Sequence, residues 1–186
     1  YQKAKNAEHI LTEQIEKGRS ELEYIDSVLD TVSRAESERE LAQIREELTE
    51  QGYLRKQKGK QRPQAALPPL EFTSSDGFKI LVGRNNTQND KLTLKIANKN
   101  DMWLHTKDIH GSHTVVFAEG REISDTAILE AAQLAAYYSK ARESSQVPVD
   151  YTLVRYVSKP SGARPGMVIY VNNKTVYVTP KANISE

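Results

Sequence analysis

The sequence predicts an α+β protein, in which a long N-terminal helical (coiled-coil) arm is followed by a mixed β-sheet domain with two helices. Residues 1–54 place apolar side chains at heptad spacing, whereas residues 70–186 alternate short apolar runs with clusters of turn-forming residues. The charge changes at the same boundary, because residues 1–54 carry a net charge of −6 and residues 55–186 one of +7. We therefore divide the chain into a helical arm (1–54), a linker (55–69) and an α+β domain (70–186).

The first predicted helix has one apolar face with the spacing of a coiled coil. The members of this face, which we call the heptad seam, are Leu11, Ile15, Leu22, Ile25, Leu29 and Val32. A second helix from about Glu36 is too short to cover a first helix roughly 50 Å long at 1.5 Å per residue. We therefore expect a second copy of the chain to pair with the seam, as a homodimer through face 11–32. The alternative is a solvated helix folded onto its own globular domain.

Between the arm and the domain lies a basic segment. Residues 55–62 contain five cations and no acid, and Pro63, Pro68 and Pro69 follow. This composition is typical of a flexible basic linker.

The domain alternates predicted strands and helices. Their predicted order is strand 70–74, strand 78–83, helix 89–98, strand 101–106, strand 112–117, helix 123–142, strand 149–157, strand 167–172 and strand 175–179. Asn89 or Asp90 is expected to cap the first helix, and Ser124 suits the N-terminus of the second.

Three polar blocks interrupt these elements. Residues 83–90 form an amide-rich run, residues 101–113 hold the only Trp of the chain among His and Asp residues, and residues 159–166 form a basic turn. The middle block predicts strand, tight turn and strand, with Trp103 and His105 on one face by alternation.

The composition and motifs exclude several kinds of site. The absence of Cys rules out disulfides and thiolate metal sites, and fits a reducing compartment. A metal site from His105, His113, Asp101 and Asp108 is disfavoured, because the two His are on different strands and no His-x-x-x-His helix is present. A nucleophilic triad from Ser112, His113 and Asp108 is weaker still, since neighbours in a turn rarely point at one another. Phosphate-loop and dinucleotide motifs are absent, so we expect no cofactor.

The blocks supply amides, hydroxyls, cations and an aromatic ring, which are the residue types that contact phosphate, ribose and unstacked bases. We therefore predict RNA contact. The candidate RNA-binding residues are Arg84, Asn85, Asn86, Gln88, Asn89, Lys107, Ser112, Lys159, Arg164 and Lys174. The alternatives are that Asn85, Asn86 and Asp90 satisfy their own loop's backbone, that the cations are merely solvated, and that Trp103 is a core residue, which its strand pattern favours.

The three blocks, in this order and spacing, resemble the NFACT-R domain, the C-terminal module of the NFACT family, which includes the RqcH proteins and the fibronectin-binding proteins of the FbpA and PavA type. The resemblance covers Gly83 to about Pro180, and more loosely Tyr1 to Arg55 as the second arm of the family's coiled coil. The motif residues are Asp90, Asp101, Trp103, His105, Asp108, Gly111, His113, Gly162 and Gly166. One departure is His110, where the family usually has Pro before Gly-Ser-His.

The resemblance implies a cytoplasmic quality-control factor that binds the obstructed large (50S) ribosomal subunit and tRNA(Ala) to support alanine tailing of stalled nascent chains. It implies a binder rather than an enzyme, because bond formation then belongs to the ribosome. The family's main tRNA-recognition residues lie in an N-terminal domain absent here, so weak, salt-dependent RNA binding is expected. Because the chain starts at Tyr1 instead of Met, we expect it to be a piece of a longer protein.

Two other functions remain open. One is an adhesin whose C-terminal region binds fibronectin, which would reach the cell surface by a non-classical route. The other is a coiled-coil interaction module with an inert domain, which would tolerate Lys107→Ala and Arg164→Ala.

Overall fold

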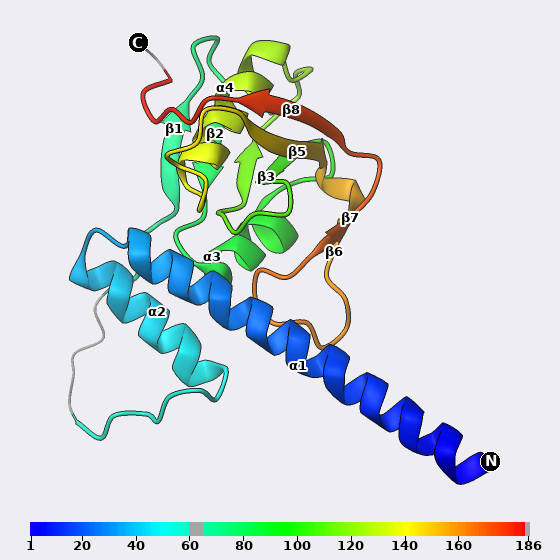
Figure 1. The fold of residues 1–186 in the computed structure, drawn as a ribbon. Helices are drawn as coiled ribbons and strands as arrows, with labels where there is room; N and C mark the ends of the chain where they lie inside the picture. The colour runs from blue at the N-terminus through cyan, green and yellow to red at the C-terminus, as the bar shows by residue number, and fades with distance from the viewer. Residues whose placement is uncertain (60–64, 185–186) are drawn as a thin grey trace.

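The computed structural model describes residues 1–59 and 65–184 and consists of a helical arm and a sheet domain packed against it (Figure 1). The arm contains α1 (Gln2–Arg34) and α2 (Glu38–Glu50). The α+β class and the long N-terminal helix predicted from the sequence are confirmed. Of the predicted linker, residues 60–64 lie outside the described residues. None of the helices in residues 1–59 and 65–184 combines the length and the apolar character that a membrane crossing requires.

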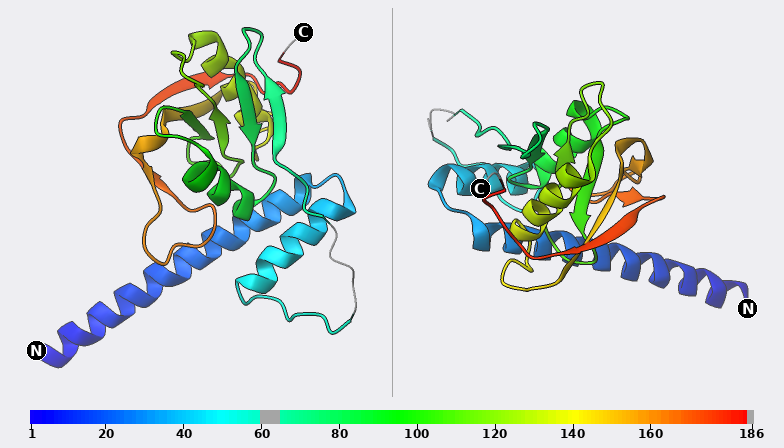
Figure 2. Two further views of the ribbon diagram at one scale, coloured as in Figure 1. Left: turned by 180° about the vertical axis from the view of Figure 1, so that it is seen from behind. Right: turned by 90° about the horizontal axis from the view of Figure 1, so that it is seen from above.

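Helix α1 uses two different faces. The heptad seam is mostly exposed, and Leu22 and Leu29 are 62% and 60% accessible. A second face carries Tyr24 and Val28, which are buried with Ile44 of α2. Figures 1 and 2 show the N-terminal half of α1 projecting away while its C-terminal half runs along the sheet domain. The helix thus packs through one face, which Ile25 of the seam adjoins, while the rest of the predicted seam has no partner helix within residues 1–59 and 65–184.

A six-stranded antiparallel sheet forms the centre of the domain. Its strands, in spatial order, are β1 (Leu70–Thr73), β2 (Lys79–Val82), β4 (Thr114–Val116), β3 (Met102–Thr106), β5 (Val147–Leu153) and β8 (Lys174–Val178). Every neighbouring pair is antiparallel, so the sheet is not mixed as predicted. The period-2 pattern specifies which face a side chain takes but not the direction of the neighbouring strand. A separate ribbon pairs β6 (Val157–Ser158) with β7 (Ile169–Tyr170), and the 3-10 turn η2 (Val154–Tyr156) precedes it.

The two faces of the sheet bury different clusters. Helix α4 (Asp125–Tyr137) covers one face with buried alanines, which let it approach the strands closely, and Ser124 caps it by accepting from the amide of Ala127. Trp103 packs on the other face with Leu92 and Val115. Helix α4 is shorter than the predicted helix 123–142, because it ends at Tyr137, five residues before the predicted end.

The first helix of the domain also differs from its prediction. Helix α3 (Asn86–Lys91) is capped by Asn85, whose side chain accepts from the amide of Gln88, and the chain continues in the π-helical segment η1 (Leu92–Ile96). Asn89 and Asp90 therefore lie inside the helix rather than at its cap. Because the Asn85 side chain already accepts from the Gln88 amide at the start of the helix, the side chains of Asn89 and Asp90 can form hydrogen bonds with neighbouring segments.

Candidate functional site

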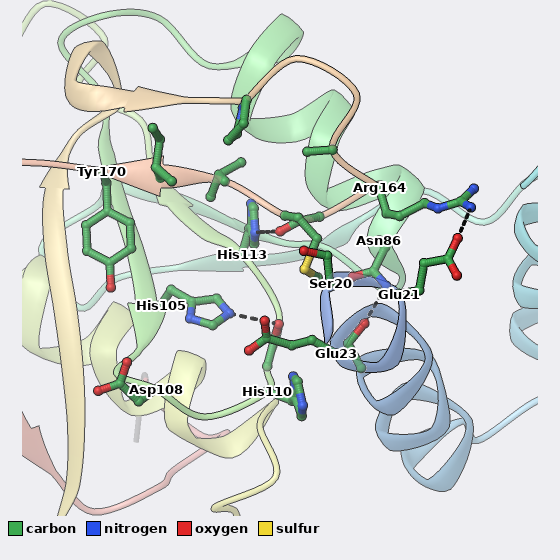
Figure 3. Close-up of a pocket in the computed structure, with 18 of the residues that line it drawn as sticks. Ser20, Glu21, Glu23, Asn86, His105, Asp108, His110, His113, Arg164 and Tyr170 are labelled. Atoms are coloured by element: carbon green, nitrogen blue, oxygen red, sulfur yellow. Dashed lines mark hydrogen bonds and ion pairs between the residues drawn. The ribbon is translucent and has the colours of Figure 1, made fainter. Parts of the chain in front are cut away.

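The polar blocks meet beside α1 around one cavity of about 780 Å³. The β3–β4 loop forms one wall, the loop 159–168 forms another, and α1 closes the third side (Figure 3). Figure 3 shows Tyr170, His105 and Asp108 on one side, with Ser20, Glu21 and Glu23 of α1 opposite. The three blocks singled out in the sequence are therefore neighbours in space.

His113, which lines this cavity, connects three segments of the domain. Its Nε2 lies 3.1 Å from the carbonyl oxygen of Gly166, and its Nδ1 lies 2.8 Å from the hydroxyl of Thr93. Burial lowers the pKa of His113 to about 3, so the ring is neutral at pH 7. A neutral ring satisfies both contacts only if Nε2–H donates to Gly166 while Nδ1 accepts from Thr93. His113 therefore joins the segments that contain Thr93 and Gly166 through its two ring nitrogens.

The ring of His105 lies at the cavity wall, where its neighbours fix its orientation. Its Nδ1 contacts the carbonyl of Thr106 at 2.7 Å and its Nε2 that of Gly111 at 3.2 Å. The ring is stacked on Trp103 with a 5.8 Å centroid separation and a 5° interplanar angle. Burial lowers the pKa of His105 as well, so neither imidazole adds positive charge here at pH 7.

Trp103 is a core residue, only 1% exposed, and it also lines the cavity. Tyr170 packs against it with a 4.7 Å centroid separation and donates its hydroxyl proton to the Asp150 carboxylate at 2.6 Å. Burial and the Asp150 carboxylate raise the pKa of Tyr170, so the hydroxyl remains a donor. The Trp103 Nε1–H is buried and has no hydrogen-bond partner within residues 1–59 and 65–184.

The first polar block is used to join the arm to the domain. Asn86 donates to the Ser27 hydroxyl on α1 at 3.0 Å, and Arg84 forms a 2.6 Å ion pair with Glu40 on α2. Asn89 accepts from the amide of His113. These side chains form internal bonds, but to other segments; of the residues expected to satisfy their own loop's backbone, Asn85 does so, whereas Asn86 binds Ser27 of α1 and Asp90 binds the loop 159–168.

The third block is held in the same way. Asp90 accepts from both the ammonium of Lys159 and the amide of Gly166. Arg164 reaches α1 and the C-terminal cap of α2, with 3.2 Å to Glu21 and 3.1 Å to the side-chain oxygen of Gln51. The loop 159–168 is thereby fixed against both the domain and the arm.

The remaining predicted residues fall into two groups. The first group is buried or bonded inside the protein. Asp101 is buried and accepts from the amides of Asn98 and Ala118. Gln88 donates to the Leu67 carbonyl, and Ser112 is buried. Lys107, Asp108, Gly162 and Lys174 are exposed. A Cβ on Gly111 would lie 2.9 Å from Ser139, and Gly166 has a positive φ of 80° with Asn86 2.4 Å from an added Cβ, so both positions need glycine. RNA contact by the ten candidate residues stays a prediction.

The sequence reasoning missed the α1 side of the cavity. Lys17, Ser20 and Glu23 line it, and so does Tyr170 of β7. The heptad spacing drew attention to the seam, whereas a second stripe, Tyr24, Ser27 and Val28, was the available signal for the packed face. Across the described ranges there is no group of three or more His, Asp or Glu residues that would hold a metal ion.

Comparison with known proteins gives a consistent result. Residues 1–66 match the family model of the NFACT N-terminal and middle domains, and residues 69–172 match the model of the NFACT protein RNA binding domain. The chain is 50% identical to the Rqc2 homolog RqcH of Bacillus subtilis over 186 residues, which cover 98% of this chain and 32% of that protein. It is 45% identical to the Rqc2 homolog RqcH of Streptococcus suis over 181 residues, which cover 97% of this chain and 32% of that protein.

A solved structure shares the whole fold. The C-terminal part of the fibronectin/fibrinogen-binding protein from Streptococcus suis matches with a TM-score of 0.92 and 43% identity, over 99% of this chain and 73% of that one. The chain spans about a third of the length of the curated relatives it matches. Since a single family model covers more than half of it, and its N-terminal part matches a second model of the same family, this chain belongs to the NFACT family.

Proposed function

We propose that this chain binds ribosomal and transfer RNA as part of a ribosome quality-control factor. The observation that carries the proposal is the match of residues 69–172 to an RNA-binding domain, in a chain half identical to an RqcH protein. The charge supports it, since residues 55–186 carry a net charge of +7. The whole factor would act in the cytoplasm on obstructed 50S subunits and recruit tRNA(Ala) for alanine tailing.

The exposed cations are the groups best suited to contact phosphate. Lys107 and Lys174 are exposed, and so are Arg55, Lys56 and Lys58 at the start of the linker. By contrast, Arg84, Lys159 and Arg164 are paired with acids of the chain itself. Phosphate contacts from the exposed group would position RNA without reading its sequence.

The chain would act as a binder and not as an enzyme. The buried His residues are neutral and hydrogen-bonded to backbone carbonyls, which suits a structural role. In the proposed system, peptide bonds form in the ribosome, and this chain contributes affinity.

The test compares binding to purified 50S subunits, tRNA(Ala) and fibronectin across a salt series. The variant Lys107→Ala/Lys174→Ala should bind both RNA partners more weakly and lower the slope of log K against log salt by about 0.7–0.9 for each lysine that neutralises a phosphate. The charge-matched control Lys3→Ala/Lys5→Ala, on the projecting end of α1, should retain tRNA binding. Equally weakened binding in both variants would reduce the effect to net charge, and absence of RNA binding by the unaltered chain would refute the proposal.

A second candidate is fibronectin binding, which the name of the similar Streptococcus suis structure favours. In that case fibronectin would bind in the same assay, the lysine substitutions would leave this binding unchanged, and neither RNA partner would bind.

A further inference from the structure

The cavity between α1 and the domain has a chemistry that phosphate binding does not explain. Two carboxylates, Asp108 and Glu23, line it from opposite sides, and neither forms an ion pair or side-chain hydrogen bond within the described residues. Of the cations that line it, Arg164 is already paired with Glu21, which leaves Lys17 at the edge. Three carboxylates, Glu21, Glu23 and Asp108, thus face two cationic side chains, so the cavity favours groups that carry N–H donors over phosphate.

One wall of the cavity is aromatic. His105 extends the face of Trp103 in a parallel stack, and Tyr170 adds a tilted ring. A neutral His105 ring has one N–H and donates to only one of the two carbonyls that its nitrogens face, those of Thr106 and Gly111. One face of the ring lies parallel to Trp103, and the ring lines the cavity. A planar base placed there continues the stack, in the way that aromatic side chains hold unstacked bases in other proteins.

The volume and the remaining donor fit the same kind of ligand. A cavity of about 780 Å³ lies within the range of roughly 300–1,000 Å³ typical of small-molecule sites. The unpartnered Nε1–H of Trp103 adds a buried donor beside the aromatic wall. The polar edge of a base offers both donors and acceptors, which a simple ammonium does not.

Among the four RNA bases, carboxylates favour guanine. Its Watson–Crick edge places two N–H donors side by side, which match the two oxygens of one carboxylate. Adenine and cytosine offer one exocyclic amino group, and the single donor of uracil lies between two carbonyl oxygens that a carboxylate repels. We propose that this cavity receives an unstacked guanine of an RNA strand, stacked on the His105 wall with its N1–H and N2–H groups donating to Asp108 or Glu23. The proposal rests on RNA binding as the function of this chain and gives it a base-specific site.

The test uses Trp103 as a built-in reporter, because it is the only Trp of the chain. Intrinsic fluorescence is followed while the RNA pentamers UUGUU, UUAUU, UUCUU and UUUUU are titrated. We expect saturable quenching by UUGUU, with an affinity about tenfold tighter than that for UUUUU because of the bidentate base contact. Binding to tRNA and to 50S subunits is measured separately by a method that does not use Trp103.

The variants separate base recognition from folding. Asp108→Asn keeps a residue that tolerates the observed φ of 53°, and Glu23→Gln changes an exposed helical side chain. The double variant should bind UUGUU and UUUUU within about twofold of each other while keeping its circular dichroism spectrum. Glu8→Gln, on the projecting part of α1, is the matched control and should keep the full preference.

The outcomes are distinguishable. RNA binding without a preference for UUGUU, or a preference that survives both substitutions, would overturn the guanine site and leave the proposed function standing. Saturable quenching by spermidine that competes with UUGUU would instead identify a cation site. Failure of the chain to bind any RNA, including tRNA and 50S subunits, would remove the proposed function itself.

Discussion

Tyr24 of α1 donates its hydroxyl proton to Glu47 of α2 across 2.6 Å, and both side chains are buried. The other oxygen of Glu47 accepts from the backbone amide and the hydroxyl of Thr87, at 2.7 and 3.0 Å. Glu47 therefore connects α1, α2 and α3 through one carboxylate. Burial and this carboxylate raise the pKa of Tyr24, which keeps the phenol protonated.

Removal of this connection should loosen the arm. Glu47→Ala leaves the Tyr24 hydroxyl and the Thr87 amide without an acceptor, and we expect the free energy of unfolding to fall by about 2–4 kcal/mol. Urea denaturation followed by circular dichroism measures it. The neighbouring exposed Glu46→Ala should change stability by less than about 0.5 kcal/mol, and equal effects at both positions would contradict the connecting role.

Stability should fall with acid because of His113. Its pKa is lowered from 6.5 to about 3 in the folded chain, so the unfolded chain takes up the proton first as pH falls. The neutral ring contributes fully to the free energy of unfolding above pH 6.5. As the pH falls from 6.5 toward 3, the free energy of unfolding decreases by about 1.4 kcal/mol per pH unit. Urea denaturation at pH 7, 6 and 5 measures the slope.

His113→Gln is the control for this slope. The variant should be less stable at pH 7 and should show a flatter dependence between pH 7 and 5, since one of the two buried imidazoles is removed. Unchanged stability of the unaltered chain between pH 7 and 5 would show that His113 titrates equally in both states.

Arg164 should act as a clamp on the loop 159–168. It binds Glu21 and Gln51 and lies over the Tyr53 ring at 5.1 Å. Arg164→Ala should cost about 1–2 kcal/mol and raise amide hydrogen exchange in residues 160–167 while the sheet stays protected. Lys174→Ala should leave this exchange unchanged, and an equally unchanged exchange in Arg164→Ala would show that the clamp contributes nothing.

The heptad seam should support self-association. Leu22 and Leu29 are more than half exposed on this face, so a second copy of the chain would bury them. Analytical ultracentrifugation should show a concentration-dependent dimer that Leu22→Glu/Leu29→Glu abolishes, with little change in circular dichroism. A monomer at all concentrations would contradict the predicted pairing.

Several helices and strands could be predicted from the sequence, because local residue patterns determine them. The seam spacing predicted α1, the alternation predicted strands near their observed positions, and Ser124 marked the start of α4. The helix around Asn89 was misplaced at its start because Asn85, Asn89 and Asp90 are all good caps, and only the surrounding contacts decide among them. The antiparallel arrangement of the strands was not predicted, because the alternation of apolar and polar residues is the same whichever direction the neighbouring strand runs.

The candidate site divides along the same line. The sequence by itself determined that three polar blocks exist, that Trp103 sits on an apolar strand face, and that the charge is separated between arm and domain, because composition and periodicity are local properties. Only the tertiary structure decided that these blocks meet around one cavity, that Arg84, Asn86 and Arg164 bind the arm through their polar groups, and that α1 supplies a wall with Glu23. These outcomes depend on contacts between residues far apart in the chain, whose geometry is set by packing and by the need to pair buried polar groups.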